Sequence, residues 1–190
     1  MLGETDGRRW RDDAGHLRTE RTCPRIRRAG LQSVRGLPAR RIRRHGCRYC
    51  YAPATLRKKR EVFHAAADQR AEILAAVERD AAKLEGDPRP VLLCFTCDPY
   101  GYEADLSVTR QAIGIMHDHN LRCQILTKGR VPDDHLPGLI AGDSLGVTLT
   151  LHDPDDSALW EPHAQPPATR INTMAAMMRI NPAVTRWASF

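Results

Sequence analysis

From about residue 61 onward, apolar and polar positions alternate between segments typical of helices and segments typical of strands. Asp68 and Asp105 are the expected N-caps of the first two helices, because each precedes apolar residues at helical spacing. A Pro-rich loop over 153–167 is expected before the last helix. The expected helices lie near 68–85, 106–119, 133–141 and 168–179.

Short apolar segments between these helices predict buried strands. They are Val91–Phe95, Arg122–Leu126, Leu145–Leu151 and a last segment that begins at Trp187. Strands that alternate with helices indicate an α/β fold with a parallel sheet, either a barrel or an open doubly wound sheet. Both architectures place their chemistry at the carboxyl ends of the strands. Polar clusters follow the first three strands at Thr96–Tyr100, Thr127–Gly129 and Thr150–Asp153, so we expect a site there.

The first 44 residues differ in character from the rest of the chain. They show no apolar periodicity, and we expect an irregular basic arm over 1–44 followed by one domain over 45–190. Residues 1–60 carry 18 Lys and Arg against 5 Asp and Glu, a net charge of +13, whereas 61–190 carry 11 against 18, a net charge of −7. Such an arm is typical of a nucleic-acid-binding segment or, more often, of a solvated tail.

Composition narrows the compartment and the kind of site. The longest strongly apolar segment, Val91–Phe95, is far shorter than the roughly 20 residues of a membrane span. No apolar segment follows the first basic residues, so we expect no secretory signal and a cytoplasmic protein. In a reducing compartment the six cysteines indicate metal or redox ligands rather than disulfides.

The most specific local feature is the C-x2-C pair Cys47 and Cys50. This spacing lets two thiolates reach one metal or cluster, and it occurs in iron–sulfur, zinc and thiol–disulfide exchange sites. A second pair, Cys94 and Cys97, offers a four-cysteine zinc site, but 43 residues separate the pairs, against about 15–20 in zinc ribbons. Cys94 is more simply a small buried apolar residue within a strand, whereas Cys97 lies at the strand end.

The segments around these cysteines resemble a known family. They are 45–52 (His-Gly-Cys-Arg-Tyr-Cys-Tyr-Ala), 95–100 (Phe-Thr-Cys-Asp-Pro-Tyr), 125–129 (Ile-Leu-Thr-Lys-Gly), 160–162 (Trp-Glu-Pro) and 170–171 (Arg-Ile). In this order and spacing they resemble the radical S-adenosylmethionine superfamily, and within it the branch related to spore photoproduct lyase. The resemblance covers about 45–190.

This resemblance implies a partial (β/α) barrel of parallel strands with outer helices, which binds a four-iron four-sulfur cluster through C-x3-C-x2-C. It also implies that S-adenosylmethionine is cleaved reductively to a 5′-deoxyadenosyl radical, with electrons from a reductase or ferredoxin-type donor. The substrate is not implied, although nucleic acid is one candidate, and no catalytic residue is assigned. Cys47 and Cys50 match the second and third cluster ligands.

The same resemblance assigns the S-adenosylmethionine contacts. Tyr49 is expected beside the adenine, and Thr96, Cys97 and Asp98 are expected to offer polar groups to the methionine amine. Lys128 is expected to pair with the methionine carboxylate.

The sequence departs from the family pattern at the first ligand position, which is Arg43. A guanidinium does not bind iron, and the candidate substitutes are Cys23 and His45. Because the chain also ends part-way through the implied barrel, we hypothesise a fragment whose residues before about 44 are out of frame. Retranslation of the upstream DNA tests this hypothesis through a Cys codon at position 43.

Two other functional interpretations remain open. One is a zinc-stabilised basic module that binds nucleic acid without catalysis, and the other is a remnant that binds neither cofactor. Anaerobic reconstitution separates them, since an iron–sulfur protein is brown and a zinc protein is colourless. We interpret His64, His117 and His119 as surface or core residues, because none has a partner at ligand spacing.

Overall fold

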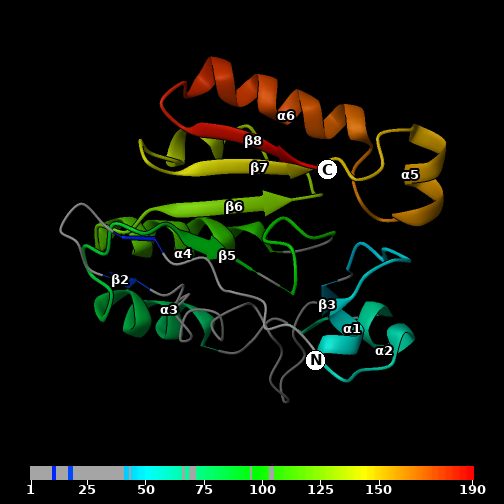
Figure 1. The fold of residues 1–190 in the computed structure, drawn as a ribbon, viewed down its shortest axis with the longest axis horizontal. Helices are drawn as coiled ribbons and strands as arrows, with labels where there is room; N and C mark the ends of the chain where they lie inside the picture. Colours follow the sequence, from blue (N-terminus) through cyan, green and yellow to red (C-terminus); the bar gives the residue numbers. More distant parts are fainter. Residues whose placement is uncertain are drawn as a thin grey trace, which may run out of the picture.

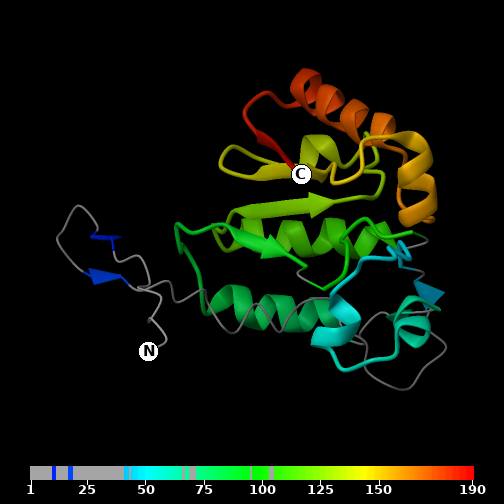
Figure 2. The same ribbon diagram turned by 45° about the vertical axis from the view of Figure 1, so that its right-hand side comes forward.

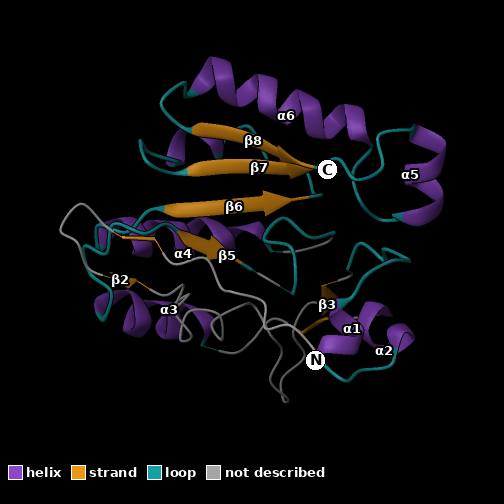
Figure 3. Cartoon of the chain, in the orientation of Figure 1, coloured by secondary structure: helices purple, strands orange, loops and turns teal. Residues whose placement is uncertain are grey.

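The computed structural model describes residues 44–65, 72–94, 96–102 and 105–190, together with the backbone of four two-residue strands. Its centre is a parallel sheet in the order β5-β6-β7-β8, with helices beside it (Figures 1 and 3). These strands are β5 (Val91–Leu93), β6 (Cys123–Thr127), β7 (Ser144–Thr148) and β8 (Thr185–Ser189). The expected α/β fold with a parallel sheet is confirmed.

The helices are short to medium in length. They are α1 (Ala52–Thr55), α2 (Arg60–Ala65), α3 (Ile73–Ala82), α4 (Leu106–Asp118), the 3-10 turn η2 (Leu136–Gly138), α5 (Pro154–Trp160) and α6 (Pro167–Ile180). Two antiparallel pairs lie outside the main sheet: β1 (Trp10–Arg11) with β2 (Leu17–Arg18), and β3 (Arg41–Ile42) with β4 (Ala67–Asp68). Apart from the backbone of β1, β2 and β3 and from Arg44, the expected arm over 1–44, including Cys23 and Arg43, lies outside the described residues. None of the described helices has both the length and the apolar character needed to cross a bilayer.

Neighbouring strands of the sheet are also consecutive in the chain, and every neighbouring pair is parallel. A doubly wound sheet reverses its strand order at one point, and this sheet has no such reversal. The order is instead that of a partial barrel. Helices α4 and α6 cover one face, where Cys123, Ile125 and Leu145 are fully buried in the shared core. In Figure 2, α6 (orange) lies along the side of β7 and β8, and α4 (green) lies behind β5 and β6.

The opposite face of the sheet borders a cavity instead of helices. Leu126, Thr148 and Ser189 line this cavity, and they alternate along their strands with residues of the helix-covered face. This is the face that looks inward in a barrel. The candidate site is therefore on the inner face of a partial barrel, near the arrowheads of the strands in Figure 1.

Two helix starts show how far local capping chemistry determines the elements. α4 begins where expected, because the carboxylate of Asp105 accepts a hydrogen bond from the Ser107 N–H at 3.1 Å. The expectation that Asp68 caps the preceding helix is wrong, since Asp68 belongs to β4 and α3 begins only at Ile73. Glu72 precedes that helix with a left-handed φ of 58° and makes no side-chain cap.

The expected loop over 153–167 contains helix α5. The carboxylate of Asp153 accepts hydrogen bonds from the N–H groups of Asp155 and Asp156, at 2.9 and 3.1 Å. Pro154 occupies the first turn, where its missing N–H costs nothing. The Asp-Pro-Asp-Asp sequence is a typical helix start, with an N-cap followed by proline and acidic residues in the first turn. The other prolines of the segment led to the prediction of a loop instead.

Candidate functional site

A cavity of about 360 Å³ lies at the carboxyl ends of β5, β6 and β7. This volume is in the range of small-molecule sites. All seven residues expected at the cofactor site line this single cavity: Cys47, Tyr49, Cys50, Thr96, Cys97, Asp98 and Lys128. The first three come from the loop before α1, and the others follow β5 and β6, as the strand-end rule predicts.

Backbone contacts fix the shape of the loop that carries the C-x2-C pair. The Cys50 N–H donates to the Cys47 carbonyl at 3.1 Å, which closes a turn between the two cysteines. The guanidinium of Arg60 in α2 donates to both of their carbonyls, at 3.3 and 2.9 Å. The Arg48 N–H donates to the Trp160 carbonyl at 2.8 Å, so the loop is also tied to the end of α5.

His45 ties the start of this loop to the strand-end turn. Its Nε2 lies 2.8 Å from Asp98 Oδ2, and its Nδ1 lies 3.1 Å from the His163 carbonyl oxygen. Both neighbours only accept hydrogen bonds, so this environment favours the doubly protonated imidazolium. Burial lowers the pKa of His45, but the charge and hydrogen bond of Asp98 outweigh burial and leave the pKa raised. With both nitrogens engaged, His45 is not arranged as a substitute cluster ligand.

Asp98 lines the cavity and holds several of its neighbours by hydrogen bonds. Its carboxylate accepts from the Thr127 hydroxyl at 2.6 Å, from the N–H groups of Lys128 and Tyr100 at 2.7 and 2.8 Å, and from His45. Burial alone would raise the pKa of Asp98. The charge of His45 and these hydrogen-bond donors outweigh burial, so the pKa of Asp98 lies below its ordinary value. Both oxygens are thus occupied, and the expected contact with a methionine amine remains a prediction.

Lys128 belongs to a buried network of charges beside the cavity. Its ammonium lies 2.7 Å from Glu161 Oε1 and also contacts the Tyr49 hydroxyl, which in turn donates to Glu161. The second oxygen of Glu161 accepts from Arg170, and both Glu161 and Arg170 are fully buried. Arg170 further donates to the Thr148 carbonyl of β7 at 2.7 Å. Two cations therefore share one carboxylate at this edge of the sheet.

The thiols of the cavity have different electrostatic surroundings. Burial raises the pKa of Cys47 to about 11, although the Lys128 ammonium, 3.9 Å from its sulfur, opposes this. On the other side, Arg44 lies in the field of Cys97, Cys50 and Cys94, and burial lowers its pKa. Two basic side chains, Lys128 and Arg44, therefore line the cavity together with the thiols.

The structure brings the four cysteines of the alternative zinc site to the same cavity, but not to one point. Cys47, Cys50, Cys94 and Cys97 all line the cavity. Nevertheless, among the described residues the one group of three His, Cys, Asp or Glu ligand atoms within 4.8 Å of one another lies elsewhere. A tetrathiolate site would require the loops to move.

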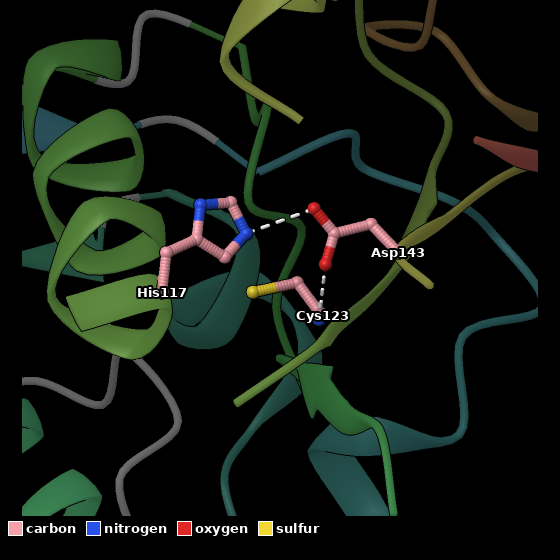
Figure 4. Close-up of side chains that lie close together, drawn as sticks. All are labelled: His117, Cys123 and Asp143. Carbon is pink, nitrogen blue, oxygen red and sulfur yellow. Dashed lines mark hydrogen bonds and ion pairs between the residues drawn. The ribbon is translucent and has the colours of Figure 1, made fainter. Parts of the chain in front are cut away.

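That other group is His117, Cys123 and Asp143, at the amino ends of β6 and β7 (Figure 4). His117 Nε2 lies 2.8 Å from Asp143 Oδ2, and the Cys123 N–H donates to Asp143 Oδ1 at 2.7 Å. The sequence offered His117 no partner at ligand spacing, and the structure places Cys123 and Asp143 beside it. Its partners come from two later segments, so no local spacing indicates them.

The sequence assigned no site role to Glu161 and Arg170, the buried ion pair that contacts Lys128 beside the cavity. Both lie in segments that carry the family resemblance, and that position is the signal that the sequence offered for them.

Comparison of the chain with protein-family models, with curated proteins and with solved structures yields no match.

Proposed function

We propose that this chain is an iron–sulfur protein of the radical S-adenosylmethionine kind, whose cluster site lacks one of the three cysteines of the family pattern. One observation carries the proposal: the Cys47–Cys50 loop meets Asp98 and Lys128 at one cavity on the inner face of a partial barrel. Three segments that are distant in the sequence converge where the strand-end rule expects chemistry.

The loop offers two of the three cysteine thiolates with which the family pattern binds the cluster. Cys47 and Cys50 would hold iron as the second and third ligands, and Arg43 stands at the position of the first ligand. Cys97 lines the same cavity and is the candidate for a third thiolate from within the described residues. When bound, the cluster supplies the electron that cleaves S-adenosylmethionine.

The residues around the loop would position the cofactor rather than react. Lys128 would exchange part of its contact with Glu161 for the methionine carboxylate, and the Glu161–Arg170 pair would keep it oriented. Asp98 would act through His45, since the pair anchors the loop just before Cys47. The apolar residues of the sheet, such as Leu126, would exclude water from the inner face.

Anaerobic reconstitution with iron and sulfide tests the proposal. We expect a brown protein that loses most of its iron in the Cys47→Ser/Cys50→Ser variant, whereas Cys123→Ser, on the other face of the sheet, serves as the control and retains iron. Arg43→Cys should raise iron and sulfide toward about four each per chain and permit S-adenosylmethionine cleavage. A folded Arg43→Cys protein that stays colourless would overturn the proposal.

The four cysteines around the cavity favour the zinc-binding alternative as the second candidate. In that case reconstituted protein would stay colourless and bind one zinc ion. Cys47→Ser and Cys97→Ser would each abolish this ion, since the site needs both pairs. A protein that binds neither iron nor zinc at these cysteines would be the inactive remnant.

A further inference from the structure

A second group of ligand atoms lies at the opposite ends of the strands from the cavity. It combines an imidazole at the end of α4, a thiol at the start of β6 and a carboxylate just before β7. Asp143 and Cys123 are completely buried, and the side chain of His117 is 14% exposed, which leaves a route for a small ion from solvent. Figure 4 shows the three groups facing one another.

The carboxylate is held in place by backbone groups. The Cys123 N–H donates to one oxygen of Asp143, and the Ile140 N–H donates to the other at 2.8 Å. Asp143 in turn holds β8, because its carbonyl accepts from the Thr185 N–H at 3.1 Å. Hydrogen-bonded carboxylates of this kind are typical of metal ligands, whose orientation must be fixed before the ion binds.

The distances need little adjustment to fit an ion. At zinc bond lengths, tetrahedral geometry separates an imidazole nitrogen from a carboxylate oxygen by about 3.4 Å and a sulfur from that nitrogen by about 3.6 Å. The nitrogen and oxygen are 2.8 Å apart, and all three ligand atoms lie within 4.8 Å of one another. Shifts of roughly 1 Å or less in side chains would therefore open the coordination space.

Charge balance selects a divalent ion. Cys123 as a thiolate and Asp143 as a carboxylate carry two negative charges, which a divalent cation neutralises without a further counterion. The combination of sulfur, nitrogen and oxygen ligands suits zinc, whereas magnesium and calcium take oxygen ligands. A neutral complex is what a buried position tolerates.

We propose that His117, Cys123 and Asp143 bind a zinc ion that fastens the end of α4 to the amino ends of β6 and β7. This site is independent of the proposed function of the cavity. On binding, the Cys123 thiol releases its proton, and neutral His117 carries its proton on Nδ1 so that Nε2 binds the metal. Without the ion, burial raises the pKa of the Cys123 thiol, which keeps it protonated and unreactive.

Cobalt(II), as a coloured substitute for zinc, tests the proposal in the full chain. The parent is the Cys47→Ser/Cys50→Ser variant, which removes the thiols of the loop. We expect one cobalt ion per chain with a thiolate charge-transfer band, displaced by zinc. Cys123→Ala should abolish the band, and His117→Gln, which keeps a donor for Asp143, should weaken binding by more than about 10-fold.

His119→Gln is the matched control on the same helix end, because His119 Nε2 instead pairs with Glu78 at 2.7 Å. It should leave cobalt affinity unchanged. Zinc at a hundredfold excess over its dissociation constant should raise the unfolding midpoint of the parent by roughly 5–10 °C and that of Cys123→Ala not at all. A band that survives Cys123→Ala, or a folded parent that binds no cobalt at millimolar concentration, would overturn the proposal.

Discussion

Glu161 is the shared counterion of the two cations beside the cavity. It is fully buried, and its two oxygens face Lys128 and Arg170. A buried carboxylate of this kind stabilises the fold chiefly because its partners would otherwise be uncompensated cations. The same arrangement keeps the Lys128 ammonium beside Cys47.

Glu161→Gln should therefore lower the free energy of unfolding by about 3–5 kcal/mol, since it leaves two cations close together without a counterion. Urea denaturation followed by circular dichroism measures the change. Glu78→Gln is the control: its carboxylate is exposed and pairs only with His119 among the described residues, so its cost should stay within about 0.5 kcal/mol. Equal costs for the two variants would contradict the assignment.

The His45–Asp98 pair predicts a pH window for stability. The pKa of His45 is raised from 6.5, so its contribution is full below about pH 6.5 and is lost as the pH rises through the folded-state pKa. The pKa of Asp98 is lowered from 3.8, so its contribution is full above about pH 4 and is lost only at lower pH. Thermal unfolding between pH 5 and 9 should show a loss on the alkaline side that His45→Gln removes. Parallel profiles for the two proteins would refute this coupling.

At the scale of elements, the loops after β5 and β6 touch at a glycine. A Cβ atom on Gly129 would lie 1.7 Å from the carbonyl oxygen of Tyr100. The absence of a side chain there lets the two strand-end loops, which carry Asp98 and Lys128, pack directly on each other. The shape of the cavity therefore depends on this contact.

Gly129→Ala should destabilise the protein by at least about 1–3 kcal/mol, because backbone atoms have to move to relieve the overlap. Gly114→Ala provides a control of opposite sign. Gly114 lies within α4 with nothing within 4 Å of its added Cβ, so alanine there should stabilise by about 0.5–1 kcal/mol. Denaturant titrations of both variants check the prediction, and a neutral Gly129→Ala would contradict the close contact.

The element scale also shows what the sequence can predict here. The four parallel strands after residue 90, helices α4 and α6 and the cap of α4 follow from local pattern, because burial and capping act within a few residues, whereas α5 was expected as a loop. The same capping rule applied to Asp68 fails, since β4 pairs that residue with Arg41. Glu161 and His117 acquire their partners only when distant segments meet, which periodicity does not encode. Strand ends are the exception, because parallel topology alone gathers them at one edge.

At the scale of the whole molecule, the sheet has two interior strands and two edges. β6 and β7 have hydrogen-bonded neighbours on both sides within the described sheet, whereas β5 and β8 each have one. The hydrophobic core centres on the interior strands, with Ile125 and Leu145 fully buried. Stability should consequently decline from the middle of the sheet outward.

Hydrogen exchange should resolve this gradient. Amides of β6 and β7 should exchange slowest, and those of β8, whose side chains are half-buried or exposed, should exchange at least about 10-fold faster. Mass spectrometry of peptic peptides provides the measurement. Protection in β8 equal to that in β6 would mean that its outer edge is covered in solution.

Cys47 and Cys50 have different environments, which allows one of them to be labelled selectively. Because burial raises the pKa of Cys47 to about 11, its thiol is almost entirely protonated at pH 8, and its side chain is shielded from reagents. Cys50 is more accessible. A short exposure to an alkylating reagent should thus attach a fluorophore to Cys50 ahead of its neighbour, and the dye would report, in real time, on whatever enters the mouth of the cavity.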